Sequence, residues 1–455
     1  MKRILLICIL TTSLFATLVG SGFIQNDLKI LNELDIDSSF ITDYKLQKYY
    51  KQFSKRHEKD YTTKLNKAEL FVPQIRHILK TNHIPSAFLY LAMAESNFML
   101  DAKSKAKAMG IWQFIPQTSK NYGLKIDEYT DERMDIIKST KAAVKYLKEL
   151  HKMFGVWYLA AISYNCGEGR VIEGLTRATL DMYCKNHQCH KNSTIKQYRQ
   201  IIRDYQHKRV KFKQLYKVYK VVKKWKYKPG IDELLIVQKG LKRQYLPKES
   251  RNYIRKIISL AMMNNSEQLL KDENIHLLNR GISSPIATVK VKGGLLLKNI
   301  ADVIGVTKQE LKSLNPHIKR NIIPPEEKEY DIYIPYSQLA RFNANIKDIK
   351  PNIFESYKVK KGDSLAKIAK EYGIHYKLIK KFNHLKTNIL SINQRLIIPI
   401  DPDTYKRPKN YFVKKGDTLG KIARTFKVPL NKIMKDNNLK TSMIHIGDKI
   451  VIKFK

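Results

Sequence analysis

Acidic residues are scarce in this sequence of 455 residues. Lys and Arg number 85, whereas Asp and Glu number only 41, so the formal net charge is +44 at pH 7. Such an excess favours polyanionic partners through long-range attraction. A chain whose solvated positions are filled by Lys by default would show the same excess. The charge therefore indicates where the protein acts more than which reaction it performs.

The N-terminus begins with a basic pair and a long apolar run. Lys2 and Arg3 precede the almost entirely apolar stretch 4–19, and small residues follow at 20–22. This order is typical of a secretory signal peptide, here 1–21, with an uncleaved membrane anchor as the alternative. We therefore expect export to the periplasm or cell envelope. A carboxylate-bearing wall polymer or an anionic membrane surface fits the charge there, and nucleic acid is not an expected partner.

Cysteine is rare, with four residues, one of which lies in the signal. In an oxidising compartment Cys184 and Cys189 can close a short loop as a disulfide. His187 and His190 lie beside them, so zinc is an alternative, although the Cys-x4-Cys spacing matches zinc sites weakly. We expect the disulfide, with no metal ion and no other cofactor. Cys166 is then an unpaired, buried thiol.

The sequence divides into a helical half and a repetitive half. Residues 22–70 are polar and helix-like, and the apolar spacing over 71–262 predicts an all-α domain. Pro85 and Ser86 mark one helix start, and further helices are expected from Ser139 to Phe154 and from Trp157. The segment 201–227 carries a basic amphipathic pattern. Its apolar stripe is expected either to pack on the core or to lie on a membrane surface.

The C-terminal half contains an internal repeat. The segments beginning at Tyr357 and Tyr411 align without gaps, and each predicts a short strand, two helices and a closing strand. These βααβ units are expected over 355–400 and 409–454. A degenerate third copy occupies 286–336, where Leu295 replaces the Asp of the other two.

Glu95 ends an apolar helical pattern and is the candidate catalytic acid. Phe88, Leu91 and Ala92 precede it on the same helical face, and burial among them would raise its pKa. Glycosidic cleavage needs such a proton donor for the departing oxygen. A solvent-exposed, incidental Glu at a helix end would show the same local pattern, so the neighbouring segments decide between the two interpretations.

Two polar and aromatic segments accompany Glu95. In the turn at 110–114, Gly110 allows close backbone approach, Trp112 and Phe114 are expected to flank sugar rings, and Gln113 is expected to bind a hydroxyl or acetamido group. Tyr164 and Asn165 end a later helix before Gly167. Each segment also fits ordinary core packing or a Gly-rich helix end.

Together these segments resemble the lysozyme-like soluble lytic transglycosylase domain of the murein transglycosylase D branch. The resemblance rests on Glu95-Ser96, on Gly110-Ile111-Trp112-Gln113 and on Ser163-Tyr164-Asn165-Cys166-Gly167. It extends to the stretches 131–133, 139–140, 146–150 and 246–253, and the repeats resemble LysM peptidoglycan-binding modules. It implies a multidomain protein, with an all-α lysozyme-like domain over 71–262, a basic insertion around 171–245, and α+β LysM modules.

The resemblance also implies a reaction. Glu95 would protonate the oxygen between MurNAc and GlcNAc and then act as base on the C6 hydroxyl, giving a 1,6-anhydro product. Asp101, Asp127 and Asp131 are candidates for a second carboxylate. A hydrolytic muramidase and a catalytically silent wall-binding scaffold are the alternatives. The expected substrate-binding residues are Ser96, Gly110, Trp112, Gln113, Phe114, Tyr164, Asn165 and Tyr253, and the expected LysM glycan-binding residues are Gly362, Asp363, Asn383, Gly416, Asp417 and Asn437.

Overall fold

The computed structural model describes residues 25–264, 285–400 and 409–453, apart from short gaps at 57–60, 62, 66–67, 325–326, 349–352, 373 and 427. The expected export signal over 1–21 lies outside the described residues. Within the described part, no helix is both long enough and apolar enough to cross a membrane. The chain forms two compact units, one from Met1–Ile126 with Asp131–Ile286 and one from Asp127–Thr130 with Ala287–Lys455.

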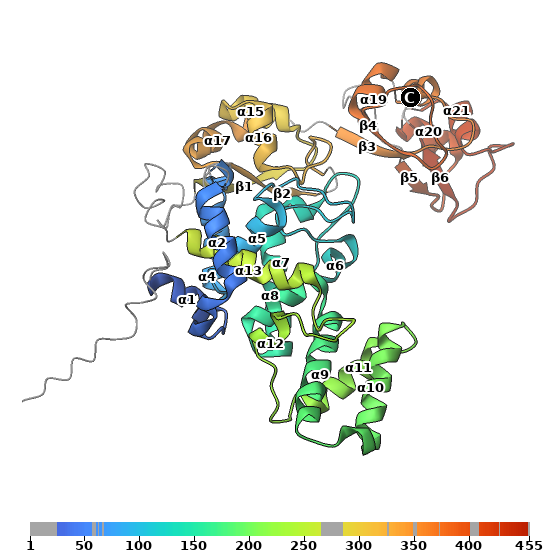
Figure 1. The fold of residues 1–455 in the computed structure, drawn as a ribbon. Helices are drawn as coiled ribbons and strands as arrows, with labels where there is room; N and C mark the ends of the chain where they lie inside the picture. Colours follow the sequence, from blue (N-terminus) through green and yellow to red (C-terminus); the bar gives the residue numbers. More distant parts are fainter. Residues whose placement is uncertain are drawn as a thin grey trace, which may run out of the picture. The chain divides into compact units, whose positions relative to one another are not determined.

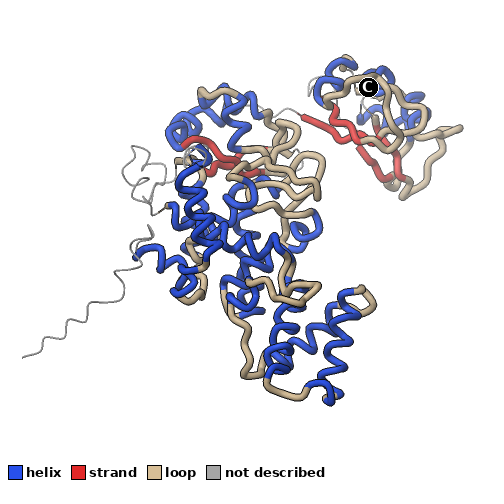
Figure 2. Tube along the Cα trace, viewed as in Figure 1, coloured by secondary structure: helices blue, strands red, loops and turns tan. Residues whose placement is uncertain are grey.

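The described part of the first unit is built from helices, as Figure 2 shows. Helix α13 packs against α1, α2, α5 and α8, while α7 packs against α4 and α8 (Figure 1). The elements are α1 (Gln25–Glu33), η3 (Ser38–Thr42), α2 (Tyr44–Arg56), α4 (Val72–Thr81), α5 (Phe88–Ser96), α6 (Pro116–Asn121), η4 (Glu132–Met134), α7 (Ile136–Phe154), α8 (Trp157–Cys166), α9 (Glu168–Lys185), η5 (Cys189–Lys191), α10 (Ser193–Gln206), α11 (Phe212–Val222), α12 (Ile231–Leu235) and α13 (Lys248–Met263).

Helix α7 shows how local sequence sets an element's ends. The Asp135 side chain accepts hydrogen bonds from the amides of Ile137 and Lys138, which have no partner inside the helix. The helix therefore starts three residues before the Ser139 predicted from apolar spacing alone. It ends at Phe154 as expected, because Gly155 adopts a left-handed conformation with φ 83°.

The expected basic insertion forms a helical extension of the first unit. Helix α11 packs on α9, and its apolar side chains Leu215, Val218, Tyr219 and Val222 are at most 5% exposed. The apolar stripe thus packs on the protein, and the lysines between its members remain exposed.

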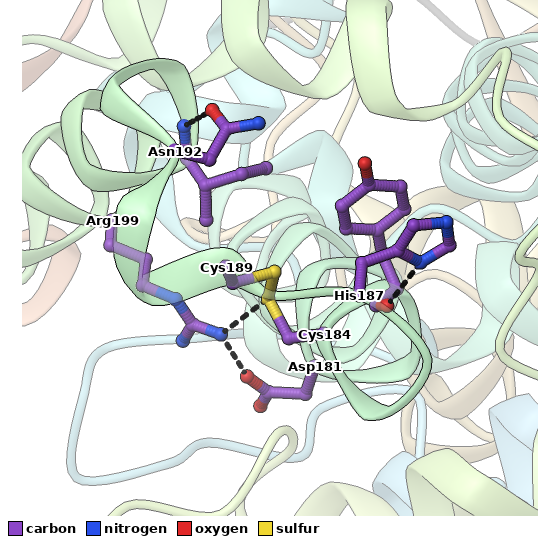
Figure 3. The surroundings of a disulfide bond; sticks show 8 residues. Asp181, Cys184, His187, Cys189, Asn192 and Arg199 are labelled. Atoms are coloured by element: carbon purple, nitrogen blue, oxygen red, sulfur yellow. Dashed lines mark hydrogen bonds and ion pairs between the residues drawn. A yellow bond between two sulfur atoms is a disulfide. The ribbon is translucent and has the colours of Figure 1, made fainter.

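A disulfide closes the turn between α9 and α10. Cys184 is bonded to Cys189, and Arg199 donates a hydrogen bond to Asp181 at 2.8 Å beside it (Figure 3). Asn192 caps α10 by accepting from the Ile195 amide at 3.0 Å. Of the two arrangements considered for these cysteines, the structure contains the disulfide, and Cys166 is a partly buried free thiol.

The second unit contains three βααβ modules, and the fold class predicted from sequence is confirmed. Each module pairs its first strand with its last in a two-stranded sheet. The pairing is antiparallel in the second and third modules, where Tyr357 faces Leu396 and Tyr411 faces Ile450. The elements are β1 (Ile286–Lys292), α15 (Leu297–Ile304), α16 (Lys308–Leu314), β2 (Glu329–Pro335), η7 (Tyr336–Gln338), α17 (Leu339–Asn345), η8 (Ile346–Asp348), β3 (Ile353–Lys358), α18 (Leu365–Glu371), α19 (Tyr376–Phe382), β4 (Arg395–Ile400), β5 (Lys409–Phe412), α20 (Leu419–Phe426), α21 (Leu430–Asp436) and β6 (Lys449–Ile452).

Candidate active site

Glu95 lies in the last turn of α5, a helix whose side chains are buried on nearly all sides. Phe88, Leu91 and Ala92 are at most 1% exposed, and Glu95 itself is partly buried. The helix ends because Asn97 takes a left-handed conformation with φ 53°. This carboxyl group is therefore carried by a rigid, apolar element.

Tyr253 fixes one oxygen of this carboxyl group. Its hydroxyl, on α13, donates a hydrogen bond to Oε1 of Glu95 at 2.5 Å. Burial raises the pKa of Glu95 above its usual value, although the Tyr253 hydrogen bond and the Lys256 charge act in the opposite direction. Oε1 accepts this bond, so Oε2 is the carboxyl oxygen that Tyr253 leaves free.

Two charged residues that the sequence did not single out act on Glu95. Lys256 donates to the backbone carbonyl of Ala94 at 3.1 Å, and its charge lowers the pKa of Glu95. Glu249, in the first turn of α13, raises that pKa by like-charge repulsion. Lys256 follows Tyr253 by three residues, so helical spacing alone would have placed both on one face.

The turn at 110–114 is held rigidly by Arg133. This side chain forms a buried ion pair with Asp131 at 2.7 Å and donates to the carbonyls of Lys107 and Phe114 at 2.7 and 3.1 Å. Gly110 has φ 80°, and a Cβ there would lie 1.8 Å from the Arg133 carbonyl oxygen. Only glycine fits this position, because the backbones approach so closely.

The side chains of this turn contact the protein itself rather than the surface where a substrate would bind. Trp112 is fully buried and donates to Thr140 at 2.9 Å, and Phe114 is 2% exposed. Buried rings have no free face for a sugar, so their predicted stacking role does not hold in this structure. Gln113 turns its amide nitrogen to the carbonyls of Ala102 and Gly110, at 3.1 and 2.8 Å.

Tyr164 joins the turn to α8 and belongs to a group of aromatic rings. Its hydroxyl donates to the Trp112 carbonyl at 2.7 Å, and its pKa is raised by burial and by the charge of Glu95. Tyr146 packs on Tyr164 with ring centroids 5.3 Å apart, and Tyr122 lies 5.1 Å from Tyr146. Tyr122 and Tyr146 are both partly exposed. Tyr164 is partly exposed as well, so all three tyrosine rings of this group offer surface to a ligand.

The remaining predicted residues contact the protein itself. The Ser96 hydroxyl donates back to the Ala92 carbonyl at 3.0 Å, inside its own helix. Asn165 accepts from Ser250 at 2.7 Å, which ties the end of α8 to the start of α13. This bond helps to hold the helix that carries Tyr253. Ser250 lies in the family-like stretch 246–253, but its sequence context did not indicate this contact with Asn165.

The proposed second carboxylates are engaged or exposed. Asp131 is paired with Arg133, Asp127 accepts from the amides of Tyr129 and Thr130, and Asp101 is exposed. Among the described residues, no group of three or more His, Cys, Asp or Glu side chains is arranged to hold a metal ion.

The residues predicted to bind glycan in the LysM-like repeats lie within the modules' own hydrogen-bond networks. Asn383 donates to the carbonyls of Ile379 and Ile397, at 2.8 and 2.7 Å, and accepts from the Ile397 amide at 2.7 Å. Asn437 makes the equivalent three bonds with Ile433 and Val451. Both donors and one acceptor position of each amide are thereby occupied, so a direct glycan contact by these amides is not supported.

The predicted acidic residues brace the turn before the first helix of each repeat. Asp363 accepts from the Tyr357 hydroxyl at 2.8 Å and the Lys360 amide at 2.7 Å, around Gly362 with φ 84°. Asp417 makes the equivalent bonds with Tyr411 and Lys414, beside Gly416. The first helix of this repeat is capped by Ser364, which accepts from the Lys367 amide at 3.2 Å.

Comparison with family models assigns four segments of the chain. A Transglycosylase SLT domain matches residues 74–179, a Lytic transglycosylase MltD, LysM-like domain matches 286–351, and LysM domains match 357–399 and 411–453. The first match contains Glu95, the 110–114 turn and Tyr164. Tyr253 lies beyond it.

Similar proteins share this organisation to different extents. The chain is 26% identical to the membrane-bound lytic murein transglycosylase D of Escherichia coli K12, over 89% of this chain and 80% of that protein. It is 30% identical to the probable peptidoglycan endopeptidase LytE of Bacillus subtilis, over 36% of this chain and 50% of that protein. A crystal structure of the spore cortex-lytic enzyme SleL of Bacillus cereus is 33% identical over 22% of each chain, with a TM-score of 0.11.

Proposed function

Since the chain is a lytic transglycosylase of the murein transglycosylase D type, we propose that Glu95 alone cleaves the MurNAc–GlcNAc bond of peptidoglycan and that a 1,6-anhydro sugar results. The observation that carries this proposal is the carboxyl group of Glu95. It is partly buried, its pKa is raised by burial, and Tyr253 binds one of its oxygens.

The reaction requires one group to act twice. Glu95 first donates the proton of Oε2 to the glycosidic oxygen, whose departure leaves positive charge on the sugar. The resulting carboxylate then accepts the proton of the MurNAc C6 hydroxyl as that oxygen bonds to C1. Because the nucleophile belongs to the substrate, no second carboxylate has to activate water, unlike in ordinary glycosidases.

The C-terminal modules support binding to the same polymer. Two LysM domains and an MltD-type LysM-like domain follow the catalytic domain. Tethered modules raise the local concentration of substrate, so each can bind weakly. We propose that the protein is exported to the cell envelope, where it binds glycan strands. An anionic membrane surface is a second candidate partner, for the exposed lysines of α11.

Product analysis tests the reaction. Glu95→Gln removes the transferable proton while keeping the side chain's shape, so we expect a loss of glycan cleavage by several orders of magnitude with unchanged binding to purified sacculi. Mass spectrometry should show wild-type products that end in anhydro-MurNAc, lighter by one water than hydrolysis products. Undiminished cleavage by Glu95→Gln would refute the assignment.

The variant Glu249→Gln distinguishes a lytic transglycosylase from the alternative, a hydrolytic muramidase. Glu249 is the exposed carboxylate whose charge acts on Glu95, so it is the group best placed to assist water. A transglycosylase should retain its anhydro products in this variant. Reducing-end products from the wild type that disappear in Glu249→Gln would instead indicate a muramidase.

A further inference from the structure

A positively charged cavity lies between α2 and α13, on the first unit. It has a volume of about 400 Å³, and Lys45 and Lys48 from α2 line it together with Lys248 and Arg251 from α13. Its other polar lining groups include Gln52 and Asn252, and none of its lining residues is acidic. The pattern calls for an explanation, because like charges gathered around one cavity repel one another.

Arg251 is the buried member of this group. Its residue is 7% exposed, and its Nε and Nη1 atoms are buried and make no hydrogen bond to any part of the chain that the structure describes. Burial lowers the pKa of Arg251, and the charge of Arg255 lowers it further. Buried N–H groups of a guanidinium that lack a partner are costly, because they lose hydration and gain no compensating bond.

The Asp43 carboxylate is already used by another arginine. Asp43 receives two hydrogen bonds from Arg255, at 2.8 Å from Nε and 2.7 Å from Nη2. Arg255 also donates to the backbone carbonyl of Arg251 at 2.9 Å, so the two arginines are neighbours along α13. Glu249 stands in the first turn of the same helix but does not line the cavity.

We propose that this cavity is a binding site for a single oxyanion, a carboxylate or a phosphate. The planar fork of Arg251 matches two oxygens of either group, and the three lysines supply the surrounding positive potential. Arg251 precedes Tyr253 by two residues, which is about 200° around a helix. The site therefore lies on another side of α13 from the Glu95 contact and goes beyond the proposed reaction.

Binding to the full-length chain at constant ionic strength tests this site. The probes are inorganic phosphate and a short peptide with a free C-terminal carboxylate, each compared with chloride, and the peptide also with its amidated form. We expect at least one oxyanion to raise the midpoint of thermal unfolding saturably, since a ligand that binds only the folded state stabilises it. Calorimetric titration supplies the Kd. Neither readout involves glycan cleavage, so the result is independent of the role of Glu95.

Substitutions of residues that line the cavity test whether the oxyanion binds there. Lys48→Gln and Lys248→Gln should each weaken the Kd by roughly two- to fivefold, as expected for one partly exposed charge. Lys141→Gln, on the exposed side of α7, removes the same charge elsewhere and should leave the Kd unchanged. Arg251→Lys keeps the charge but loses the fork, and should weaken binding more than either lysine variant.

The outcomes are distinct. Saturable binding of phosphate alone, of the free-carboxylate peptide alone, or of both supports the site and identifies its ligand class. The absence of saturable stabilisation by either probe overturns the proposal. An equal Kd in Lys48→Gln, Lys248→Gln and the wild type overturns it as well.

Discussion

At the scale of single residues, opposing effects set the protonation of Glu95. Burial in the last turn of α5 raises its pKa, whereas the Tyr253 hydroxyl and the Lys256 charge lower it. The balance matters for the reaction we propose, in which the group gives up a proton and later takes one back. A pKa far above the working pH would weaken the base, and one far below it would leave no acid.

Lys256 therefore tunes the alkaline limb of the pH profile. Lys256→Gln removes a positive charge that lowers the pKa of Glu95, so that pKa should rise. The protonated acid then persists to higher pH, and the decline of kcat/KM at alkaline pH should shift upward. Lys256→Arg keeps the charge and should leave the limb in place. A limb that moves equally in both variants would mean that Lys256 acts through packing.

Single residues also show which features of the site could be predicted from the sequence. The apolar face before Glu95 predicted its burial, because helical spacing fixes which side chains share a face. No such spacing exists for Trp112 and Phe114, for which the sequence left sugar contacts and core packing open. Their positions in a turn do not tell which side of the backbone faces the core, and the Arg133 bonds that orient this turn connect residues distant in sequence.

At the scale of elements, one asparagine in each of the three modules connects the parts of that module. Asn315, Asn383 and Asn437 each connect the second helix of a module to its closing strand through three hydrogen bonds. The gapless repeat identified Asn383 and Asn437, but not their role, because a repeated polar residue fits a shared ligand and a shared fold equally well. The degenerate module keeps its Asn although it lacks the Asp, which is consistent with a structural role.

Asn383→Ala should destabilise its module. The buried amide and carbonyl of Ile397 would lose their side-chain partner, which we expect to cost roughly 2–4 kcal/mol. The Ile379 carbonyl would keep its hydrogen bond from the backbone amide of residue 383. Asn388→Ala is the matched control, since Asn388 is exposed and should change stability by less than about 0.5 kcal/mol. Hydrogen exchange in the full-length chain measures both, and protection should fall in 353–400 only. Equal protection in the two variants would show that the three bonds contribute little.

At the scale of the whole molecule, positive charge is distributed unevenly along the chain. Between Asp204 and Asp232 the sequence contains ten Lys and Arg residues and no acidic residue. This stretch includes α11, whose buried stripe fixes the helix to α9 and leaves Lys217 and Lys220 exposed. Lys224 is exposed in the turn that follows the helix, and we call these three lysines the basic face. The sequence predicted the amphipathic pattern, since a period of 3.6 residues is a local property, and of its two expected placements the structure shows packing on the protein. The sequence did not predict the break between α10 and α11 at 207–211.

This basic face should contribute a salt-sensitive part of wall binding. Replacing Lys217, Lys220 and Lys224 by Gln should weaken binding to sacculi by about tenfold at low salt, taking about 0.5 kcal/mol for each exposed charge. The difference should vanish at high salt, because screening removes attraction between exposed charges. A control that replaces Lys29, Lys141 and Lys145, all exposed on other helices, lowers the net charge equally. If both triple variants lose affinity equally, the attraction comes from the charge of the whole molecule, and the α11 face has no special role.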